Sequence, residues 1–292
     1  MNFVLAAGGT GGHMIPAHAL AAELRSRGHG VLLITDERGA KIPGLFEGVP
    51  VHVLPAGRLG GGPLGWIKAA RSVLAGRREA RALYREHRPD AVVGFGGYPA
   101  FPSLIAASAA KIPTVLHEQN AVLGRVNRLV AREAHAVATA YEQVQRLKPS
   151  FEGKTVLVGN PVREAVVRLG EMPFPPFDLT SPLKILVTGG SQGASVLGQV
   201  VPAGLGELKP SLRHRLQVVQ QCRPDDIEQV RDAYRLLEIP AELVTYIEDM
   251  PAKLGEAHLV IARAGASTIA ELTTAGRPAI LIPLPSATDD HQ

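Results

Sequence analysis

This chain of 292 residues has a single cysteine and only a small excess of charge of one sign. The single cysteine, Cys222, excludes an internal disulfide and a cysteine-based zinc site, and it fits a reducing compartment. Lys and Arg number 31 against 27 Asp and Glu, which gives a net charge of only +4. Such a balance does not require a nucleic-acid partner, and we expect none.

Long apolar runs are also missing. The apolar run at residues 3–7 is too short for a secretory signal and has no basic residue before it. The longest uncharged stretch, residues 91–110, has the length of a membrane span, but three glycines and two prolines interrupt it. We therefore expect a strand, a loop and a helix in this stretch.

Glycine and proline are abundant, with 31 and 23 residues. Repeated strand-to-helix turns use both readily, whereas helical bundles do not. Short apolar or β-branched runs alternate with longer helical patterns, which predicts an α/β fold of βαβ units with parallel sheets. The predicted strands are residues 2–7, 31–35, 51–54, 91–94, 114–116, 136–138 and 155–158, then 183–188, 216–220, 242–245, 259–262 and 279–282.

The chain is long enough for two domains with separate cores. The proline-rich residues 172–181 separate the two series of strands and are typical of a linker. Because the pattern restarts, we expect two Rossmann-like doubly wound domains, 1–163 and 164–292, that face each other across a cleft. No helix follows the last predicted strand, so we expect the C-terminal helices to be missing and the second domain to be incomplete.

Each series begins with a glycine-rich turn after its first strand, GGTGGH at residues 8–13 and GGSQGA at residues 189–194. Glycines at such a turn let the backbone approach a phosphate, and the amides that open the next helix attract its charge. Neither turn matches the full G-x-G-x-x-G fingerprint, and neither is a P-loop. The alternative is a tight turn that only packs helix on strand.

A third turn, RAGAST at residues 263–268, also suits a phosphate. We expect Ser267 or Thr268 to cap a helix that runs to about Ala275. Glu271 then falls near the first turn, where its carboxylate can accept hydrogen bonds from two vicinal ribose hydroxyls. The alternative is an acid that only caps the helix or complements its dipole.

Six motifs together carry a specific resemblance that runs in order from residue 2 to residue 292. They are GGTGGH at 8–13, HEQN at 117–120, GNPVR at 159–163, GGSQGA at 189–194, YIEDM at 246–250 and RAGASTIAEL at 263–272. With these motifs the chain resembles the MurG family, the N-acetylglucosaminyltransferases of bacterial peptidoglycan synthesis.

The resemblance implies a GT-B glycosyltransferase with the lipid-linked acceptor on its first domain and UDP-N-acetylglucosamine (UDP-GlcNAc) on its second. It implies transfer of GlcNAc, with inversion, to the C4 hydroxyl of N-acetylmuramic acid (MurNAc) in lipid I, which gives lipid II. Two alternatives stay open. One is a UDP-GlcNAc 2-epimerase, and the other is a nucleotide-sugar-binding module without catalysis.

By motif position, the resemblance also implies the substrate contacts. The uracil is expected against the backbone of Ile247, the ribose on Glu271, and the diphosphate near Ser191 and Gln192, with Arg163 facing the donor. The remaining expected contacts are Thr10, Gly11, Gly12, Asn120, Ala266, Ser267, Thr268 and Gln292.

Sugar transfer needs stabilisation of charge on the leaving diphosphate and a base for the acceptor hydroxyl. No Asp-x-Asp motif, with which many such enzymes hold a metal, occurs in the sequence, so we expect no metal and no cofactor. His13 is the first candidate base, because an imidazole works near neutral pH. Glu118 is the second. Either residue can instead bond its own loop.

Residues 64–88 gather seven Lys and Arg against two Glu, with Trp66, Ile67, Leu74 and Leu83 among them. This pattern is typical of a helix that lies on an anionic membrane surface. The alternative is an amphipathic helix that packs Leu74 and Leu83 on the sheet and leaves a solvated basic face. Since the implied acceptor carries an undecaprenyl chain, we expect a peripheral protein on the cytoplasmic face of the bacterial plasma membrane.

Overall fold

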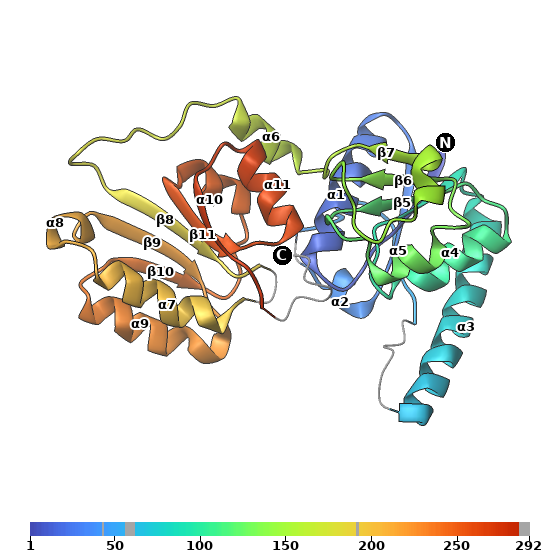
Figure 1. Cartoon of the computed structure of the whole chain (residues 1–292), viewed down its shortest axis with the longest axis horizontal. Coiled ribbons are helices and arrows are strands. Elements are labelled where there is room, and N and C mark those ends of the chain that lie inside the picture. Colours follow the sequence, from blue (N-terminus) through green and yellow to red (C-terminus); the bar gives the residue numbers. More distant parts are fainter. Residues whose placement is uncertain (43, 56–61, 191–192, 286–292) are drawn as a thin grey trace. The chain divides into compact units, whose positions relative to one another are not determined.

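The computed structural model describes residues 1–42, 44–55, 62–190 and 193–285. The chain divides into two compact units, Met1–Pro161 and a second that begins at Val162 (Figure 1). Each unit has its own parallel sheet and its own hydrophobic clusters, and each is described separately below.

The first unit contains a seven-stranded sheet in the order β3-β2-β1-β4-β5-β6-β7, and every pair of neighbours is parallel. Its strands are β1 (Asn2–Ala6), β2 (Gly30–Thr35), β3 (Val51–Val53), β4 (Ala91–Gly94), β5 (Thr114–Glu118), β6 (Ala136–Thr139) and β7 (Thr155–Leu157). Its helices are α1 (Gly11–Ser26), α2 (Glu37–Ala40), α3 (Gly62–His87), α4 (Ala100–Ala109), α5 (Arg125–Val130) and the short 3₁₀ helix η1 (Pro149–Lys154).

Helices cover both faces of this sheet, as the unbroken apolar strands require. Along β1, Val4 and Ala6 belong to the cluster under α3, α4 and α5, whereas Leu5 and Ala7 belong to the cluster under α1. Alternation with period two therefore buries both faces of one strand.

The second unit contains a five-stranded parallel sheet in the order β10-β9-β8-β11-β12. Its strands are β8 (Leu183–Thr188), β9 (Leu216–Gln221), β10 (Ala241–Val244), β11 (Leu259–Arg263) and β12 (Ala279–Ile282). Its helices are α6 (Glu164–Gly170), α7 (Ser195–Gly206), α8 (Pro210–Arg213), η2 (Pro224–Asp226), α9 (Ile227–Leu236), α10 (Met250–Glu256) and α11 (Ala266–Thr274).

Helices cover both faces of the central strands of this second sheet as well, whereas the edge strand β12 is largely exposed. Helices α7 and α9 pack on the face with Ile185 and Val187, and helices α6, α10 and α11 pack on the face with Leu186. Cys222 lies in the first of these two clusters, where burial raises the pKa of its thiol to about 11. The cysteine is therefore a packing residue.

All twelve predicted strands are confirmed, and all of them pair in parallel. The uncharged stretch 91–110 is strand β4, a loop and helix α4, as expected, and residues 171–182 form neither helix nor strand. None of the helices in the described part of the chain is long and apolar enough to cross a membrane.

Candidate functional site

Three loops meet at one edge of the first sheet, because the carboxyl ends of parallel strands lie together. They follow β1, β4 and β5, and β4 lies between the other two strands. Gly9 has φ +87°, and α1 begins at Gly11 with Thr10 as its N-cap, although the Thr10 side chain makes no capping hydrogen bond. Gly11 and Gly12 are therefore the first helical residues, as a phosphate-binding turn requires.

His13 lies in the first turn of α1, against the glycine loop that follows β4. A Cβ on Gly96 would lie 3.4 Å from His13 Cε1, and one on Gly97 would lie 3.3 Å from His13 Cδ2 and 2.8 Å from the Gly8 carbonyl oxygen. Both glycines have positive φ. Side chains at these two positions would be strained and would crowd the imidazole.

A chain of polar contacts leads inward from the His13 ring. His13 Nδ1 lies 3.1 Å from Gln119 Oε1, and Gln119 Nε2 lies 2.9 Å from His117 Nδ1. His117 Nε2 lies 3.1 Å from the carbonyl oxygen of Gly159. We call this set the His13–Gln119–His117 chain. It joins α1, the end of β5 and the segment after β7.

The structure engages both carboxylate oxygens of Glu118 in ordering its own loop. Oε1 accepts from the backbone and side-chain nitrogens of Asn120, both at 3.1 Å. Oε2 accepts from Gly124 N at 2.8 Å and from Asn127 Nδ2 at 2.9 Å. The carboxylate is buried, and this geometry favours the loop-ordering alternative over the role of base.

In the second unit, the loop after β8 approaches its own helix closely. A Cβ on Gly189 would lie 2.4 Å from Ala194 N, and Gly190 and Gly193 have positive φ. Thr188 Oγ1 accepts from Gly190 N at 3.3 Å and donates to Gln221 Oε1 at 3.0 Å, which fixes the start of the turn. The expected contacts Ser191, Gln192 and Gln292 lie outside the described residues.

The buried Glu271 carboxylate forms an ion pair with the part-buried Arg163. Arg163 Nε and one terminal nitrogen lie 2.8 and 2.7 Å from Glu271 Oε1, and the two side chains are 19% and 8% exposed. Burial raises the pKa of the Glu271 carboxyl, and the Arg163 guanidinium opposes that shift. The pair brings together two of the expected donor contacts, one at the N-cap of α6 and one on α11.

The prediction for the cap of α11 is wrong. Gly265 is the N-cap residue and the helix begins at Ala266, so Ser267 and Thr268 are already helical. Glu271 lies in the second turn, which leaves no acid in the first. A capping role is therefore excluded for Glu271, whose carboxylate contacts Arg163 instead. Ile247, the expected uracil contact, is buried and follows β10 at the same sheet edge as the β8 turn.

Three buried side chains near these loops were not selected from the sequence. Gln119 and His117 lie inside the HEQN motif, but the sequence alone does not show that Gln119 links His117 to His13. Asn160, inside GNPVR, has a buried side-chain amide with neither atom hydrogen-bonded to a described residue. A buried amide without a partner costs about 1–3 kcal/mol, so Asn160 is a further candidate for a ligand contact.

Comparison with known families first defines the class of protein. The model of the glycosyltransferase family 28 N-terminal domain matches residues 3–139, and that of the glycosyltransferase family 28 C-terminal domain matches residues 184–292. The two matches begin at or next to β1 and β8, the first strands of the two sheets. An all-parallel two-unit protein with this pair of domains is a glycosyltransferase.

Named relatives then narrow the class. The chain is 63% identical over 291 residues to a UDP-N-acetylglucosamine--N-acetylmuramyl-(pentapeptide) pyrophosphoryl-undecaprenol N-acetylglucosamine transferase from Erythrobacter litoralis, covering 100% of the chain and 73% of the relative. A transferase of the same name from Novosphingobium aromaticivorans is also 63% identical, with 100% and 75% covered. The chain belongs to this family of transferases.

Solved structures agree with the fold. A crystal structure of MurG from Acinetobacter baumannii matches with a TM-score of 0.69 and 30% identity, over 100% of this chain and 80% of that one. A UDP-GlcNAc 2-epimerase from Neisseria meningitidis, bound to UDP-GlcNAc, matches with a TM-score of 0.66 over 96% and 82% of the two chains. At 15% identity, the second match shows a shared fold alone.

Proposed function

We propose that the protein transfers GlcNAc from UDP-GlcNAc to the C4 hydroxyl of MurNAc in undecaprenyl-pyrophosphoryl-MurNAc-pentapeptide, the lipid I acceptor, and so forms lipid II. The observation that carries this proposal is 63% identity across 291 residues to transferases named for that reaction. Inversion by a single displacement makes the new bond β(1→4) and forms no covalent glycosyl-enzyme.

Donor binding is assigned to the second unit. The Glu271 carboxylate accepts from the two ribose hydroxyls. Both Arg163 contacts use Oε1, so Oε2 is left as an acceptor for the ribose. The helix start at Ala266 offers backbone amides to the diphosphate. The Gly190 and Gly193 amides donate within the turn after β8, and the glycines there let the phosphates approach the backbone closely. Ile247 contacts the uracil.

Acceptor activation is assigned to the first unit, with His13 as base. Because Glu118 already accepts four hydrogen bonds, an imidazole in the glycine-rich turn is the better proton acceptor. His13→Ala is expected to lower kcat on the order of 100-fold or more, with the Kd for UDP-GlcNAc nearly unchanged. An effect confined to the donor Kd would assign His13 a structural role.

Helix α3 is the proposed membrane-binding element. Its small residues Ala69, Gly76 and Ala80 are buried, whereas Ile67 and Leu74 are 51% and 56% exposed. The alternative in which Leu74 packs on the sheet is therefore wrong, although Leu83 does pack against the core. Exposed apolar side chains on a basic helix favour contact with lipid.

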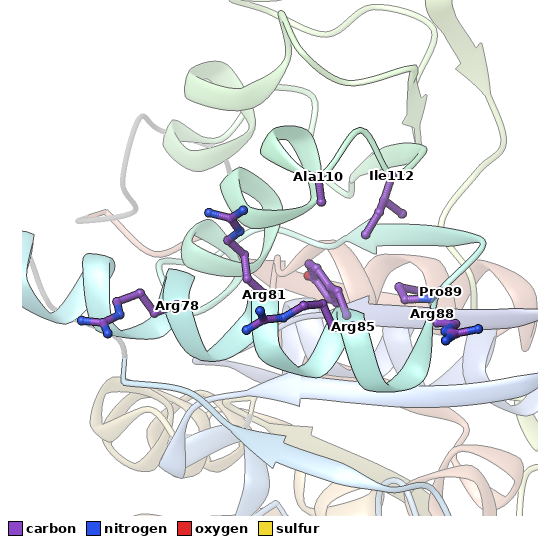
Figure 2. A pocket seen from close by; sticks show the side chains of 8 residues that line it. Arg78, Arg81, Arg85, Arg88, Pro89, Ala110 and Ile112 are labelled. Carbon is purple, nitrogen blue, oxygen red and sulfur yellow. The ribbon is translucent and has the colours of Figure 1, made fainter.

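The arginines of α3 line one side of an open pocket of about 580 Å³. Figure 2 shows Arg78, Arg81 and Arg85 along the helix, with Arg88 just beyond its end. None of these four has a hydrogen-bond or ion-pair partner within the described ranges of the chain. Within α3, spacings of three and four residues place Arg78, Arg81 and Arg85 on the same side as Ile67 and Leu74, so these guanidinium groups can meet lipid phosphates.

Vesicle flotation tests this membrane surface. The variant with Arg78, Arg81 and Arg85 changed to Gln is expected to lose about 3 kcal/mol of affinity for anionic vesicles at low salt, roughly 100-fold. The matched control changes Arg168, Arg231 and Arg235 to Gln, because these exposed arginines pair with acids in the second unit. Equal binding by both variants would contradict a role for α3. We propose that this surface meets the cytoplasmic face of the plasma membrane.

Product analysis tests the reaction itself. Labelled UDP-GlcNAc is incubated with the protein, with and without lipid I. The proposal predicts label in an extractable lipid only when lipid I is present. A soluble epimer formed without acceptor would indicate the 2-epimerase, and no product at all would indicate a binding module.

A further inference from the structure

Donor and acceptor chemistry assigns a direction to each contact in the His13–Gln119–His117 chain. The Gly159 carbonyl oxygen can only accept, so His117 Nε2 at 3.1 Å must carry the proton. Burial lowers the pKa of His117, which keeps the ring neutral and leaves Nδ1 as an acceptor. Only the amide nitrogen of Gln119 can donate to that Nδ1, at 2.9 Å.

The backbone also fixes the orientation of the Gln119 amide. Gln119 Nε2 donates to the His117 carbonyl oxygen at 3.1 Å in addition to the ring. If the Gln119 amide were flipped, its oxygen would face two acceptors, the His117 carbonyl oxygen and the lone pair of His117 Nδ1. Both contacts would be repulsive. Gln119 Oε1 therefore faces His13 Nδ1, at 3.1 Å.

Burial makes this arrangement rigid. Gln119 and His117 are 2% and 4% exposed, so water does not compete for their polar atoms. The Phe95 ring packs on the His117 ring with centroids 5.4 Å apart. Asn127 Nδ2 donates to the same His117 carbonyl oxygen at 3.2 Å and links the chain to the loop held by Glu118.

We propose that Gln119, held in place by His117, is the positioning residue that fixes the neutral His13 ring as the Nδ1–H tautomer, so that Nε2 carries the lone pair. The proposal rests on the transfer function and deepens it. In the reaction, the acceptor oxygen forms a bond to the anomeric carbon of GlcNAc, and the bond from that carbon to the diphosphate oxygen breaks. UDP leaves with the electron pair, and the hydroxyl proton passes to His13 Nε2.

A neutral amide in this position differs from the carboxylate of a Ser-His-Asp triad. Both orient an imidazole through Nδ1–H. The carboxylate also stabilises the imidazolium with a full charge, whereas the amide oxygen offers only a dipole. Gln119 thus selects the tautomer of the neutral ring without placing a full negative charge beside it.

Nitrogen NMR of the histidine rings tests the tautomer without any substrate. The whole chain is labelled with ¹⁵N-histidine, the His13 signals are assigned by their loss in His13→Ala, and the spectrum is recorded where the rings are neutral. We expect a protonated Nδ1 and an unprotonated Nε2 for His13. His135 and His258 accept backbone N–H bonds at Nδ1, so they provide reference signals of the opposite tautomer.

Two variants at position 119 separate a positioning role from a structural one. Gln119→Glu still presents an acceptor oxygen to His13 Nδ1, whether ionised or protonated, and is expected to keep the tautomer. Gln119→Leu removes both amide atoms and is expected to shift His13 toward Nε2–H. A wild-type His13 protonated at Nε2, or the same tautomer in Gln119→Leu, would overturn the proposal.

Kinetics then connect the tautomer to the reaction. Gln119→Leu is expected to lower kcat on the order of 10- to 100-fold with the KM for UDP-GlcNAc unchanged. In a His13→Ala background the same change is expected to have no further effect, because Gln119 acts through His13. An equal loss in both backgrounds would overturn the positioning role. Failure of the wild-type chain to transfer GlcNAc would contradict only the proposed function, since the NMR result does not depend on turnover.

Discussion

Burial and ion pairing act in opposite directions on the pKa of Glu271, the proposed ribose contact. Burial is the larger influence and raises the pKa of the carboxyl, while Arg163 lowers it. A carboxyl whose pKa is raised in the folded state makes the protein more stable below the pKa of the unfolded chain. That stability is lost as the pH rises through the raised folded value.

Removing Arg163 should therefore destabilise the protein in a pH-dependent way. Arg163→Met leaves a buried, unpaired carboxylate and is expected to lower the free energy of unfolding by about 3 kcal/mol at neutral pH. The loss should shrink below the unfolded pKa, where Glu271 is protonated in both states. Urea unfolding at several pH values measures it. Arg168→Met, which breaks an exposed pair with Glu164, is the control and should cost less than about 0.5 kcal/mol.

A second residue-scale prediction concerns the ribose. Glu271→Gln is expected to weaken UDP binding by about 1.5–3 kcal/mol, because a charged acceptor is replaced by a neutral one. For a UDP analogue that lacks both ribose hydroxyls, calorimetry should give the same Kd for the wild-type protein and for Glu271→Gln. If Glu271→Gln weakened binding of UDP and of the analogue equally, Glu271 would not act through the ribose hydroxyls.

At the scale of single elements, two helical glycines occupy opposite environments. A Cβ on Gly76 in α3 would lie 2.9 Å from the Pro55 carbonyl oxygen and 3.0 Å from Pro102 Cβ. A Cβ on Gly204 in α7 would meet nothing within 4 Å. The same substitution should therefore have opposite effects in the two helices.

Gly76→Ala is expected to lower the free energy of unfolding by about 1–3 kcal/mol, because α3 must move away from its neighbours. Gly204→Ala should raise it by about 0.5–1 kcal/mol, since alanine favours the helix and restricts the unfolded chain. Thermal unfolding of both variants measures the difference. A stabilised Gly76→Ala protein would show that α3 is not closely packed.

The central strands, such as β1 and β8, were predictable from sequence because they are apolar runs buried on both faces. The exposed side of α3 was not predictable. Apolar residues occur on two of its sides. Periodicity alone does not show that the side with small residues packs against the core while Leu74 is exposed. The cap of α11 was mispredicted because Gly265 serves as the N-cap just before the serine and threonine.

Of the candidate sites, the glycine turns and Glu271 could be selected from the sequence, because phosphate and ribose binding require particular residue types. The link from His13 to Gln119 could not. It depends on which loops the strand order β1-β4-β5 places side by side, and residues 13 and 119 are far apart in sequence. Gln119 also shows no charge that would mark it as functional.

At the scale of the whole molecule, the distribution of charge matters more than its sum. The net charge is only +4, yet residues 64–88 gather seven basic side chains against two acidic ones. Electrostatic attraction to an anionic surface falls off within about 8–10 Å at physiological salt, so the local cluster decides binding. The two charged features lie on different units: the basic helix α3 on the first and the Arg163–Glu271 ion pair on the second.

The most direct test of the account is transfer of labelled GlcNAc from UDP-GlcNAc to purified lipid I in the presence of excess EDTA. Because no Asp-x-Asp motif occurs, the predicted result is a lipid-linked disaccharide with a β(1→4) bond, formed at the same rate with and without the chelator. No transfer to the lipid under either condition, or transfer to water alone, would contradict the central claim.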